Sequence, residues 1–286
     1  RLLADGADVR RMDRVPPAAP PAFETMIGEL QDREFIDTIV ERTRPEYVFH
    51  LAAVKDRASE ISDFQRAVEI NLLGTLHLLS AAATVASLRS VIVVGTAEEY
   101  GRNPCPFRES MREMPVSSYS FSKLCVTQMC EVLARLHGLP VTVVRPTLAY
   151  GPGQGQGMFL PDLIMCLLKG EPFGMTAGEQ TRDYVYVTDL VDACVRAAAA
   201  TGQAGRVYNI GSGVQVKVAE LAEAVAALVG GEGGIRLGVK PYRPGEIMAY
   251  AVDNTRAREE LGWSPQVALN EGLRRTVEYY RGLSAR

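Results

Sequence analysis

The chain has 286 residues, of which 47% are hydrophobic and 23% are charged, and its formal net charge is −3. The slightly negative charge and the absence of a basic tract argue against binding of nucleic acid. No apolar run approaches the roughly 20 residues of a membrane span. The five cysteines lack metal-ligand or Cys-x-x-Cys spacing. The sequence therefore predicts a cytoplasmic protein with reduced thiols and no metal site.

The N-terminus has the pattern of the second half of a dinucleotide-binding βαβ unit. Residues 1–4 resemble the last turn of a helix, Asp5 and Gly6 form a turn, and residues 9–12 resemble a short strand before Asp13. In such units the acid that binds the adenosine ribose follows the glycine-rich phosphate loop by about 20 residues. If Asp13 is this acid, the first strand and the phosphate loop fall before residue 1. The alternative is that Asp13 is an ordinary surface acid.

Strand-like and helical segments alternate along the next two hundred residues. Runs rich in Val and Ile predict strands at 47–51, 91–95, 141–145 and 207–210. Helical periodicity predicts helices at 34–44, 64–86, 119–137 and 187–200. Near-continuous apolar strands are typical of parallel sheets that are buried on both faces. We therefore expect an α/β fold with a doubly wound parallel sheet, Rossmann-like, that apparently lacks its first strand and glycine loop in this chain.

The composition changes after residue 150, where glycine and proline become frequent and the later elements become shorter. The glycines of 151–157 do not follow the first strand of a dinucleotide-binding unit and are interrupted by Pro152, so they do not replace a phosphate loop. Amphipathic helices at 218–229 and 269–281 indicate a smaller α/β domain. The predicted division is a dinucleotide-binding domain of residues 1–150 and 183–211, and a substrate-binding domain of residues 151–182 and 212–286.

Three residues form the strongest candidate for a catalytic group. Tyr119 and Lys123 are four residues apart at the start of a predicted helix, which places them on one face. An ammonium group lowers the pKa of a neighbouring phenol, so Tyr119 could exchange a proton with a hydroxyl or a ketone near neutral pH. Thr96 ends a predicted strand at the carboxyl edge of the sheet, where its hydroxyl could hold the same oxygen.

Several motifs together resemble the extended short-chain dehydrogenases/reductases, in the branch of nucleotide-sugar epimerases, dehydratases and ketoreductases. The matching stretches run nearly end to end: VFHLAAVK (48–55), NLLGT (71–75), VVGTAEEYG (93–101), YSFSK (119–123), RPTLAYGPGQ (145–154), GEQTRDYVYVTDL (178–190), YNIGSG (208–213), PYRPGE (241–246) and LGWSP (261–265). The resemblance implies an NAD-dependent enzyme, with NADP as an open alternative, that acts on a nucleoside-diphosphate sugar and forms a homodimer.

The resemblance also assigns roles to positions of this chain. Thr96, Tyr119 and Lys123 would be the catalytic triad, with Glu98 as an additional catalytic residue. The cofactor would be bound by Asp13, Glu29, Leu30, Leu51, Ala52, Ala53, Lys55, Asn71, Tyr119, Lys123 and Pro146. Substrate would be bound by Thr96, Arg182, Arg243 and Glu246, with the two arginines on the diphosphate. Asp13 favours NAD, because a carboxylate repels a 2′-phosphate, although Arg14 beside it leaves NADP open.

Three positions bear on the type of reaction that the resemblance implies. Glu98 occupies the position at which related dehydratases carry the base for water elimination, but Ala97 stands where one dehydratase group has an acid. Leu148 replaces an asparagine that contacts substrate in many relatives. EEYG (98–101) and Leu148 slightly favour a 4-ketoreductase, followed by a 4-epimerase and then by a 4,6-dehydratase. A non-catalytic binding protein is the alternative if the phosphate loop is absent.

Overall fold

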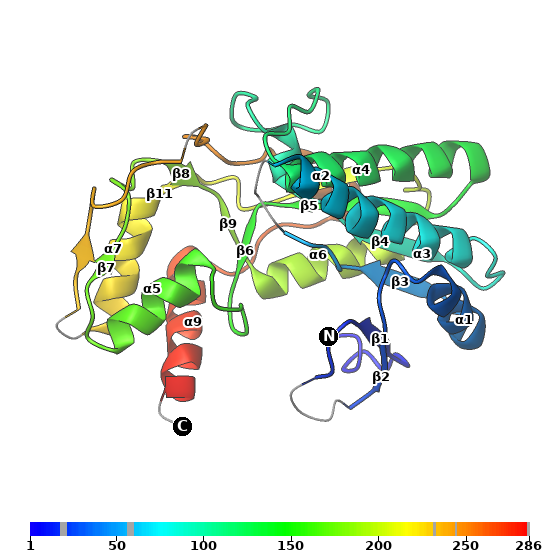
Figure 1. Cartoon of the computed structure of the whole chain (residues 1–286), viewed down its shortest axis with the longest axis horizontal. Coiled ribbons are helices and arrows are strands. Elements are labelled where there is room, and N and C mark those ends of the chain that lie inside the picture. The colour runs from blue at the N-terminus through cyan, green and yellow to red at the C-terminus, as the bar shows by residue number, and fades with distance from the viewer. Residues whose placement is uncertain (18–21, 56–59, 231–232, 244, 285–286) are drawn as a thin grey trace. The chain divides into compact units, whose positions relative to one another are not determined.

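The computed structural model describes residues 1–17, 22–55, 60–230, 233–243 and 245–284 (Figure 1). The chain divides into two compact units. Unit 1 comprises residues 1–99, 115–144 and 194–207, and unit 2 comprises residues 100–114, 145–193 and 208–286. These bounds differ from those of the predicted cofactor and substrate domains, which are defined by what each domain binds. That functional division stays a prediction.

The main sheet has four strands in the order β10-β5-β4-β3. Strands β3 (Tyr47–His50), β4 (Ser90–Val94) and β5 (Val141–Pro146) are parallel neighbours, and β10 covers Val207–Ile210. Every residue of β5 is buried, as is expected for a strand with both faces covered. The four strands lie where the sequence predicts them, and the prediction of an α/β fold with a parallel sheet is confirmed.

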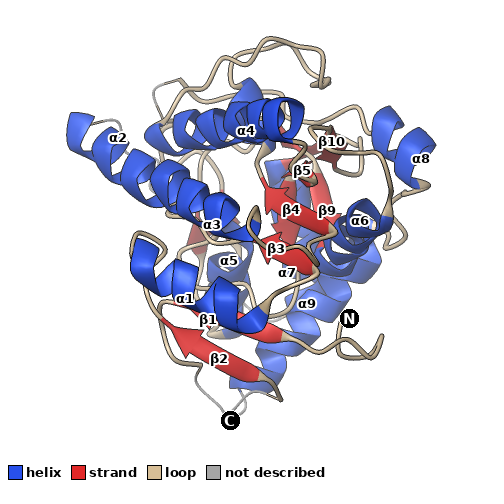
Figure 2. Cartoon of the chain, turned by 90° about the vertical axis from the view of Figure 1, so that its right-hand side faces the viewer, coloured by secondary structure: helices blue, strands red, loops and turns tan. Residues whose placement is uncertain are grey.

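Four α-helices lie wholly within the described residues of unit 1. These are α1 (Arg33–Thr43), α2 (Ile61–Ala67), α3 (Gly74–Ala82) and α4 (Ser118–His137). Buried Val and Leu side chains of β4, β5, α3 and α4 form one core cluster, and α1 and α3 form a second around Ile36 and Leu78. Figure 2 shows α1 beside the small β1–β2 pair.

The helix predicted at 64–86 is wrong as a single element. A π-helical segment, η1 (Val68–Leu73), separates α2 from α3, and helical structure ends at Ala82. Apolar periodicity does not reveal a π segment, because it adds only one residue to a turn. The segment places Asn71 in the interior, where it is 1% exposed.

Strands β1 (Arg10–Asp13) and β2 (Glu24–Ile27) pair in parallel and form a separate two-stranded sheet. Asp13 is the last residue of β1, and β2 was not predicted. Residues 2–6 form a turn and not a helix, with the Asp5 amide donating to the Arg1 carbonyl at 3.0 Å.

Unit 2 is built on a cluster of helices with short strands. The helices α5 (Phe159–Leu168), α7 (Val218–Val229) and α9 (Leu269–Ser284) pack on one core with β6 (Leu148–Tyr150) and β9 (Tyr184–Tyr186). Two further elements belong partly to unit 1: η2 (Ala97–Tyr100) and α6 (Val187–Ala199). The others are β7 (Phe173–Gly174), β8 (Thr181–Arg182), β11 (Val216–Lys217), β12 (Ile235–Arg236) and α8 (Thr255–Leu261).

Among the helices of the described residues, none has the length and apolar character that crossing a membrane requires.

Candidate active site

Helix α4 begins on a capping box that fixes the position of Tyr119 and Lys123. The hydroxyl of Ser117 accepts from the Ser120 amide at 3.1 Å, and the Ser120 hydroxyl accepts from the Ser117 amide at 3.0 Å. Tyr119 is 7% exposed and Lys123 is 2% exposed. The helix therefore places a phenol and an amine on the same face, both shielded from solvent.

The electrostatic state of Lys123 is set mainly by burial, which lowers its pKa to about 8. The Glu99 carboxylate and the Cys130 thiol act in the opposite direction, while the positive charge of Lys55 adds to the lowering. An amine that titrates this close to neutral pH is typical of a site of proton chemistry.

The turn that carries Thr96 follows directly after β4. The Glu98 amide donates to the Thr96 hydroxyl oxygen at 3.2 Å, and the Thr96 amide donates to Glu99 Oε1 at 2.9 Å. The other carboxylate oxygen of Glu99 accepts from the Thr127 hydroxyl at 2.8 Å. Since Thr127 is on α4, Glu99 ties the Thr96 turn to the helix of Tyr119 and Lys123.

Asn71 ties the segment after β3 to the same helix. Its Oδ1 accepts from the Val54 amide at 2.8 Å, and its Nδ2 donates to the Val54 carbonyl at 3.0 Å and to the Ser122 hydroxyl at 2.9 Å. Ser122 in turn donates to the Tyr119 carbonyl at 2.8 Å. The π-helical segment that carries Asn71 therefore contacts both the predicted cofactor segment and the helix of the predicted catalytic pair.

Four of the predicted cofactor residues, Leu51, Ala52, Ala53 and Lys55, follow the carboxyl end of β3. Because β3 and β4 are parallel neighbours, these residues emerge at the same sheet edge as Thr96, the edge where open α/β sheets bind ligands. Leu51 is 64% exposed, Ala52 and Lys55 are exposed, and Ala53 is half-buried.

Other predicted cofactor residues lie in different surroundings. Asp13, at the end of β1, accepts from the Arg11 guanidinium and from the Val15 amide, and these bonds hold the pKa of its carboxyl below its usual range. Glu29 is exposed, whereas Leu30 is buried in the core around α1 and α3, so its side chain has a packing role. Pro146, the last residue of β5, is buried.

The predicted substrate residues of unit 2 include an ion pair. One guanidinium nitrogen of Arg182 donates to the carbonyls of Thr181 at 2.8 Å and Ile247 at 2.7 Å, and another contacts the Glu246 carboxylate. Arg243 is exposed on the loop before Glu246, whose amide donates to the Arg243 carbonyl at 3.1 Å. Arg182 is therefore held in place by its own unit.

Glu99 is a site residue that sequence reasoning missed. The sequence prediction selected Glu98, which is half-buried, and gave no role to Glu99, which is completely buried. The available signal was the second acid in a tight turn between a buried strand and Tyr100. Which of two adjacent carboxylates faces the interior depends on the turn, and the sequence does not specify its geometry.

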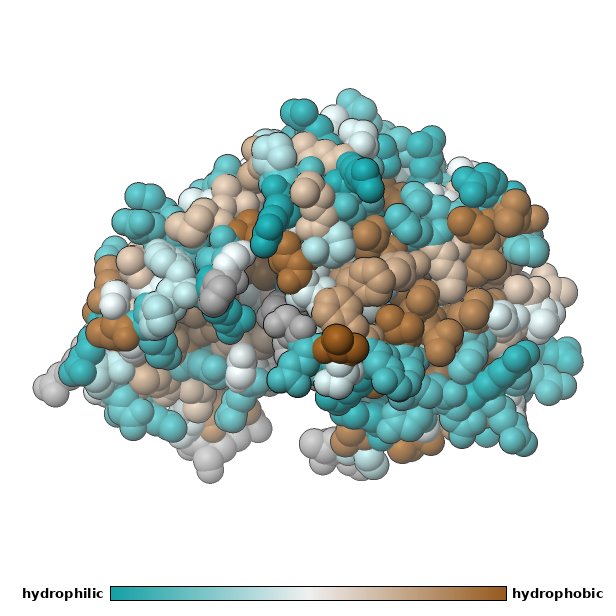
Figure 3. All heavy atoms as spheres, turned by 45° about the horizontal axis from the view of Figure 1, so that its top comes forward, coloured by the Kyte–Doolittle hydropathy of each residue, from teal (hydrophilic) through white to brown (hydrophobic). Residues whose placement is uncertain are grey.

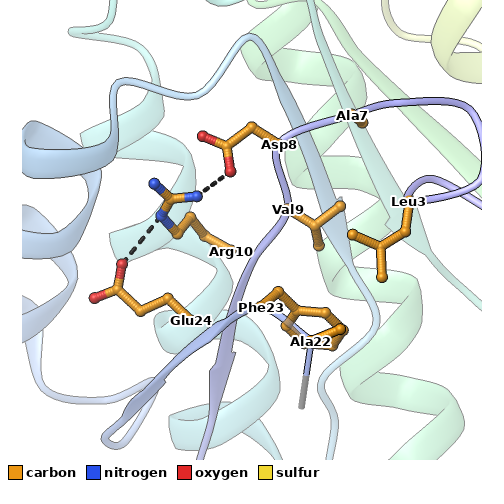
Figure 4. Close-up of a pocket in the computed structure, with 8 residues that line it drawn as sticks. All are labelled: Leu3, Ala7, Asp8, Val9, Arg10, Ala22, Phe23 and Glu24. Carbon is orange, nitrogen blue, oxygen red and sulfur yellow. Dashed lines mark hydrogen bonds and ion pairs between the residues drawn. The ribbon is translucent and has the colours of Figure 1, made fainter.

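A depression at the opposite, N-terminal ends of β1 and β2 contains none of the candidate residues (Figure 4). Leu3, Val9 and Phe23 line it, and Arg10 bridges the carboxylates of Asp8 and Glu24, with 3.0 Å between Arg10 Nε and Glu24 Oε2. Its charged groups are paired with one another, so the depression offers no catalytic constellation.

Throughout the described ranges, no group of three or more His, Cys, Asp and Glu side chains is arranged to hold a metal ion.

Comparisons with a family model and with known proteins identify one family. The model of the NAD-dependent epimerase/dehydratase family matches residues 1–211. The chain is 34% identical to a UDP-glucose 4-epimerase of Mycolicibacterium smegmatis, over 99% of this chain and 94% of that protein. It is 32% identical to a dTDP-glucose 4,6-dehydratase of Streptomyces niveus, over 89% of this chain and 75% of that protein.

A solved structure agrees with the sequence relatives. The crystal structure of a UDP-glucose 4-epimerase from Thermotoga maritima, determined with UDP-glucose, matches with a TM-score of 0.90 and 31% identity. The match covers 99% of this chain and 94% of that one. The chain therefore belongs to the NAD-dependent epimerase/dehydratase family and is an enzyme of its nucleotide-sugar branch.

Proposed function

We propose that the enzyme catalyses NAD-dependent oxidoreduction at carbon 4 of a nucleoside-diphosphate hexose, as a 4-epimerase with a UDP-hexose as substrate. The observation that carries the proposal is the buried Tyr119–Lys123 pair, tied through Glu99 to the turn of Thr96. The identity to a UDP-glucose 4-epimerase supports the choice of substrate.

The residues fit a dinucleotide in two respects. Two small residues, the exposed Ala52 and the half-buried Ala53, follow β3 at the ligand-binding edge and allow close approach to the backbone. Asp13 ends β1 with its carboxyl held ionised. Leu51, Lys55 and Asn71 would complete this part of the site. NAD, when bound, would supply the group that accepts a hydride and returns it. The carboxylate of Asp13 favours NAD over NADP, as it would repel a 2′-phosphate.

Tyr119 and Thr96 would share the substrate hydroxyl. Because the Glu98 amide donates to Thr96 Oγ1, the hydroxyl proton of Thr96 remains able to donate to a sugar oxygen. Tyr119 would remove the proton of the 4-hydroxyl as the carbon is oxidised, and would return it when the ketone is reduced. Lys123 in its ammonium form would stabilise the phenolate of Tyr119 before the proton is removed and after it is returned.

In unit 2, Arg182 and Arg243 would bind the substrate diphosphate, and Glu246 would accept from the nucleotide ribose. A diphosphate would have to compete with Glu246 for the guanidinium of Arg182, because the two side chains pair in the structure. The carbonyls of Thr181 and Ile247 would keep the guanidinium in place during this exchange.

We favour a 4-epimerase over the 4-ketoreductase that the EEYG string slightly favours. Both reactions use the same residues. The 34% identity to an epimerase, in a match that covers 99% of this chain, supports the 4-epimerase. A 4,6-dehydratase is the second candidate, since Glu98 is available as a base and a dehydratase is 32% identical. Ala97, which is completely buried, supplies no acid for the departing hydroxyl.

The test begins with identification of any nucleotide that the denatured protein releases. We expect tightly bound NAD, followed by interconversion of UDP-glucose and UDP-galactose without net consumption of added NADH. Consumption of reduced nicotinamide with a 4-keto-6-deoxy nucleotide sugar would identify a ketoreductase instead. Formation of a 4-keto-6-deoxy product that Glu98→Gln abolishes would identify a dehydratase.

We further propose that two copies of the chain associate through α2, η1 and α4, in the cytoplasm. These elements pack on one another, and Phe64 and Phe121 bring their ring centroids within 5.7 Å. Apolar surface is visible over this part of unit 1 in Figure 3. The exposed apolar side chains on these elements are Ile61, Leu73, Phe121, Val132 and Leu136.

A further inference from the structure

The carboxylate of Glu99 is completely buried, at the end of the turn that begins with Thr96. Each of its oxygens is bonded to a different element, Oε1 to the Thr96 amide at 2.9 Å and Oε2 to the Thr127 hydroxyl on α4 at 2.8 Å. A carboxylate in such surroundings is costly unless bonds and an opposite charge compensate it. The two hydrogen bonds satisfy the oxygens, and the positive charge has to come from elsewhere.

The candidate for this opposite charge is Lys123. It is 2% exposed, one helical turn before Thr127, and Glu99 is the strongest influence that favours its charged form against burial. The same carboxylate acts on the thiols of Cys125 and Cys130, whose pKa values it helps to raise. The negative charge of Glu99 is therefore felt along the buried side of α4.

The other groups that face Lys123 do not provide an anion at neutral pH. Burial raises the pKa of Cys130 to about 12, so this thiol stays neutral. Lys55 repels the ammonium. His50, at the end of β3, has its pKa lowered to about 3 by burial and by Lys123, so its imidazole is also neutral. The phenolate of Tyr119 that the proposed mechanism requires depends itself on the ammonium group of Lys123, so it is not an independent counter-ion.

We propose that Glu99 is a positioning residue: its carboxylate is the internal counter-ion that keeps Lys123 charged, and it holds the Thr96 turn against α4. The inference rests on the proposed function in so far as Lys123 serves Tyr119 during proton transfer. Glu99 itself is completely buried and acts on the reaction through Lys123 and Thr96.

Glu99→Gln changes the charge of the side chain and leaves its shape nearly unaltered. Glutamine keeps a carbonyl oxygen for the Thr96 amide and a polar group for Thr127, but it removes the negative charge. Thr127→Val is the complementary change, because it keeps the charge and removes one hydrogen bond. Glu131→Gln is the matched control, since it changes an exposed carboxylate on the same helix.

The decisive measurement is the titration of Lys123 in the full chain, by NMR of protein labelled with ¹³C at the lysine Cε. The chain has five lysines, and Lys123→Met identifies the resonance of Lys123. We expect Glu99→Gln to lower the pKa of Lys123 by about one unit or more. Thr127→Val and Glu131→Gln should leave it within about 0.3 of that of the unaltered protein.

The pH profile of turnover is a second measurement. A purely structural role of Glu99 would not shift this profile along the pH axis. With less ammonium at a given pH, the alkaline limb of the kcat/KM profile should move to lower pH in Glu99→Gln by the same amount as the titration. A Lys123 titration that is unchanged in Glu99→Gln would overturn the proposal. The titration needs no turnover, so the two proposals can fail separately. If the chain is inactive on nucleotide sugars but Glu99→Gln still lowers the pKa of Lys123, the proposed function is refuted and the role of Glu99 as counter-ion is supported.

A double variant decides the question if Glu99→Gln does not fold. Glu99→Met with Lys123→Met removes both charges and leaves apolar side chains of similar size. If Glu99 and Lys123 compensate each other, the double variant should unfold at higher denaturant concentration than Glu99→Met alone. Equal or lower resistance of the double variant would show that Glu99 is needed for the turn and would overturn its role as counter-ion.

Discussion

Burial determines the chemistry available at individual residues of this site. Lys123 and Tyr119 are near-completely enclosed on α4, and burial brings the pKa of Lys123 down to about 8. An exposed pair with the same spacing would keep ordinary pKa values, because water solvates both charged forms. The proton transfer that we propose therefore depends on the core around α4 as much as on the two residues themselves.

Replacement of Tyr119 tests the proton transfer at the scale of one atom. Tyr119→Phe removes only the phenolic oxygen, so we expect kcat to fall by about 10²- to 10⁴-fold with little change in folding. The measurement is turnover of the nucleotide sugar together with circular dichroism. Tyr279→Phe, at an exposed position on α9, is the control and should keep full activity. Retention of most activity in Tyr119→Phe would contradict the assignment.

His50 makes a prediction about acid stability. Its ring nitrogen Nε2 lies 2.8 Å from the Thr75 hydroxyl, and burial lowers its pKa from 6.5 to about 3. Between these two values the unfolded chain binds a proton that the folded chain excludes, so stability should fall as the pH decreases from about 6.5, by at most about 1.4 kcal/mol per pH unit.

His50→Asn should reduce this loss, because asparagine keeps a hydrogen-bonding group and does not titrate. Urea unfolding at pH 7 and at pH 4.5 measures the difference. His137→Asn, at the exposed end of α4, should retain the pH dependence of the unaltered protein. If His50→Asn loses stability with acid as steeply as the unaltered chain, His50 does not contribute to it.

At the scale of elements, local sequence signals fix where several helices begin and end. Ser117 caps α4, Gly138 ends it with φ of 66°, and the predicted helix at 119–137 is accordingly within one residue of the observed one. The short strands β6 to β9 were not predicted. With two or three residues each, they show no measurable alternation, and only their pairing within unit 2 defines them.

Helix α9 offers a test of close packing within unit 2. A Cβ at Gly272 would overlap the ring of Tyr150 and lie 2.9 Å from Cδ2 of Tyr186. Gly272→Ala should therefore cost about 1–3 kcal/mol in the free energy of unfolding, although alanine favours helix. Gly282→Ala, on the same helix with no atom within 4 Å, should be neutral or stabilising by up to about 1 kcal/mol. Chemical denaturation of both variants measures these effects, and equal stability of the two would contradict the packing argument.

At the scale of the whole molecule, the proposed homodimer depends on the apolar face of α2, η1 and α4. Val132 and Leu136 are four residues apart on α4, and are 39% and 67% exposed. Replacement of both by glutamate should yield a monomer in analytical ultracentrifugation, because burial of two carboxylates in an apolar interface is unfavourable. Leu283→Glu, at an exposed apolar position of unit 2, should leave the association state unchanged. A monomeric unaltered chain would refute the proposed dimer.

The sequence by itself determined the fold class, the four strands of the main sheet, the family and the candidate residues Thr96, Tyr119 and Lys123. The strands, the fold class and the candidate residues depend on local patterns, namely β-branched runs and the spacing of a few polar side chains, whereas the family follows from the resemblance of whole motifs. Only the tertiary structure decided that η1 turns Asn71 inward, that Glu99 and not Glu98 is buried beside α4, that Leu30 packs in the core, and that Arg182 pairs with Glu246. The reason is physical: burial and pairing arise between segments that are distant along the chain, and no local pattern records which side of a turn faces the interior.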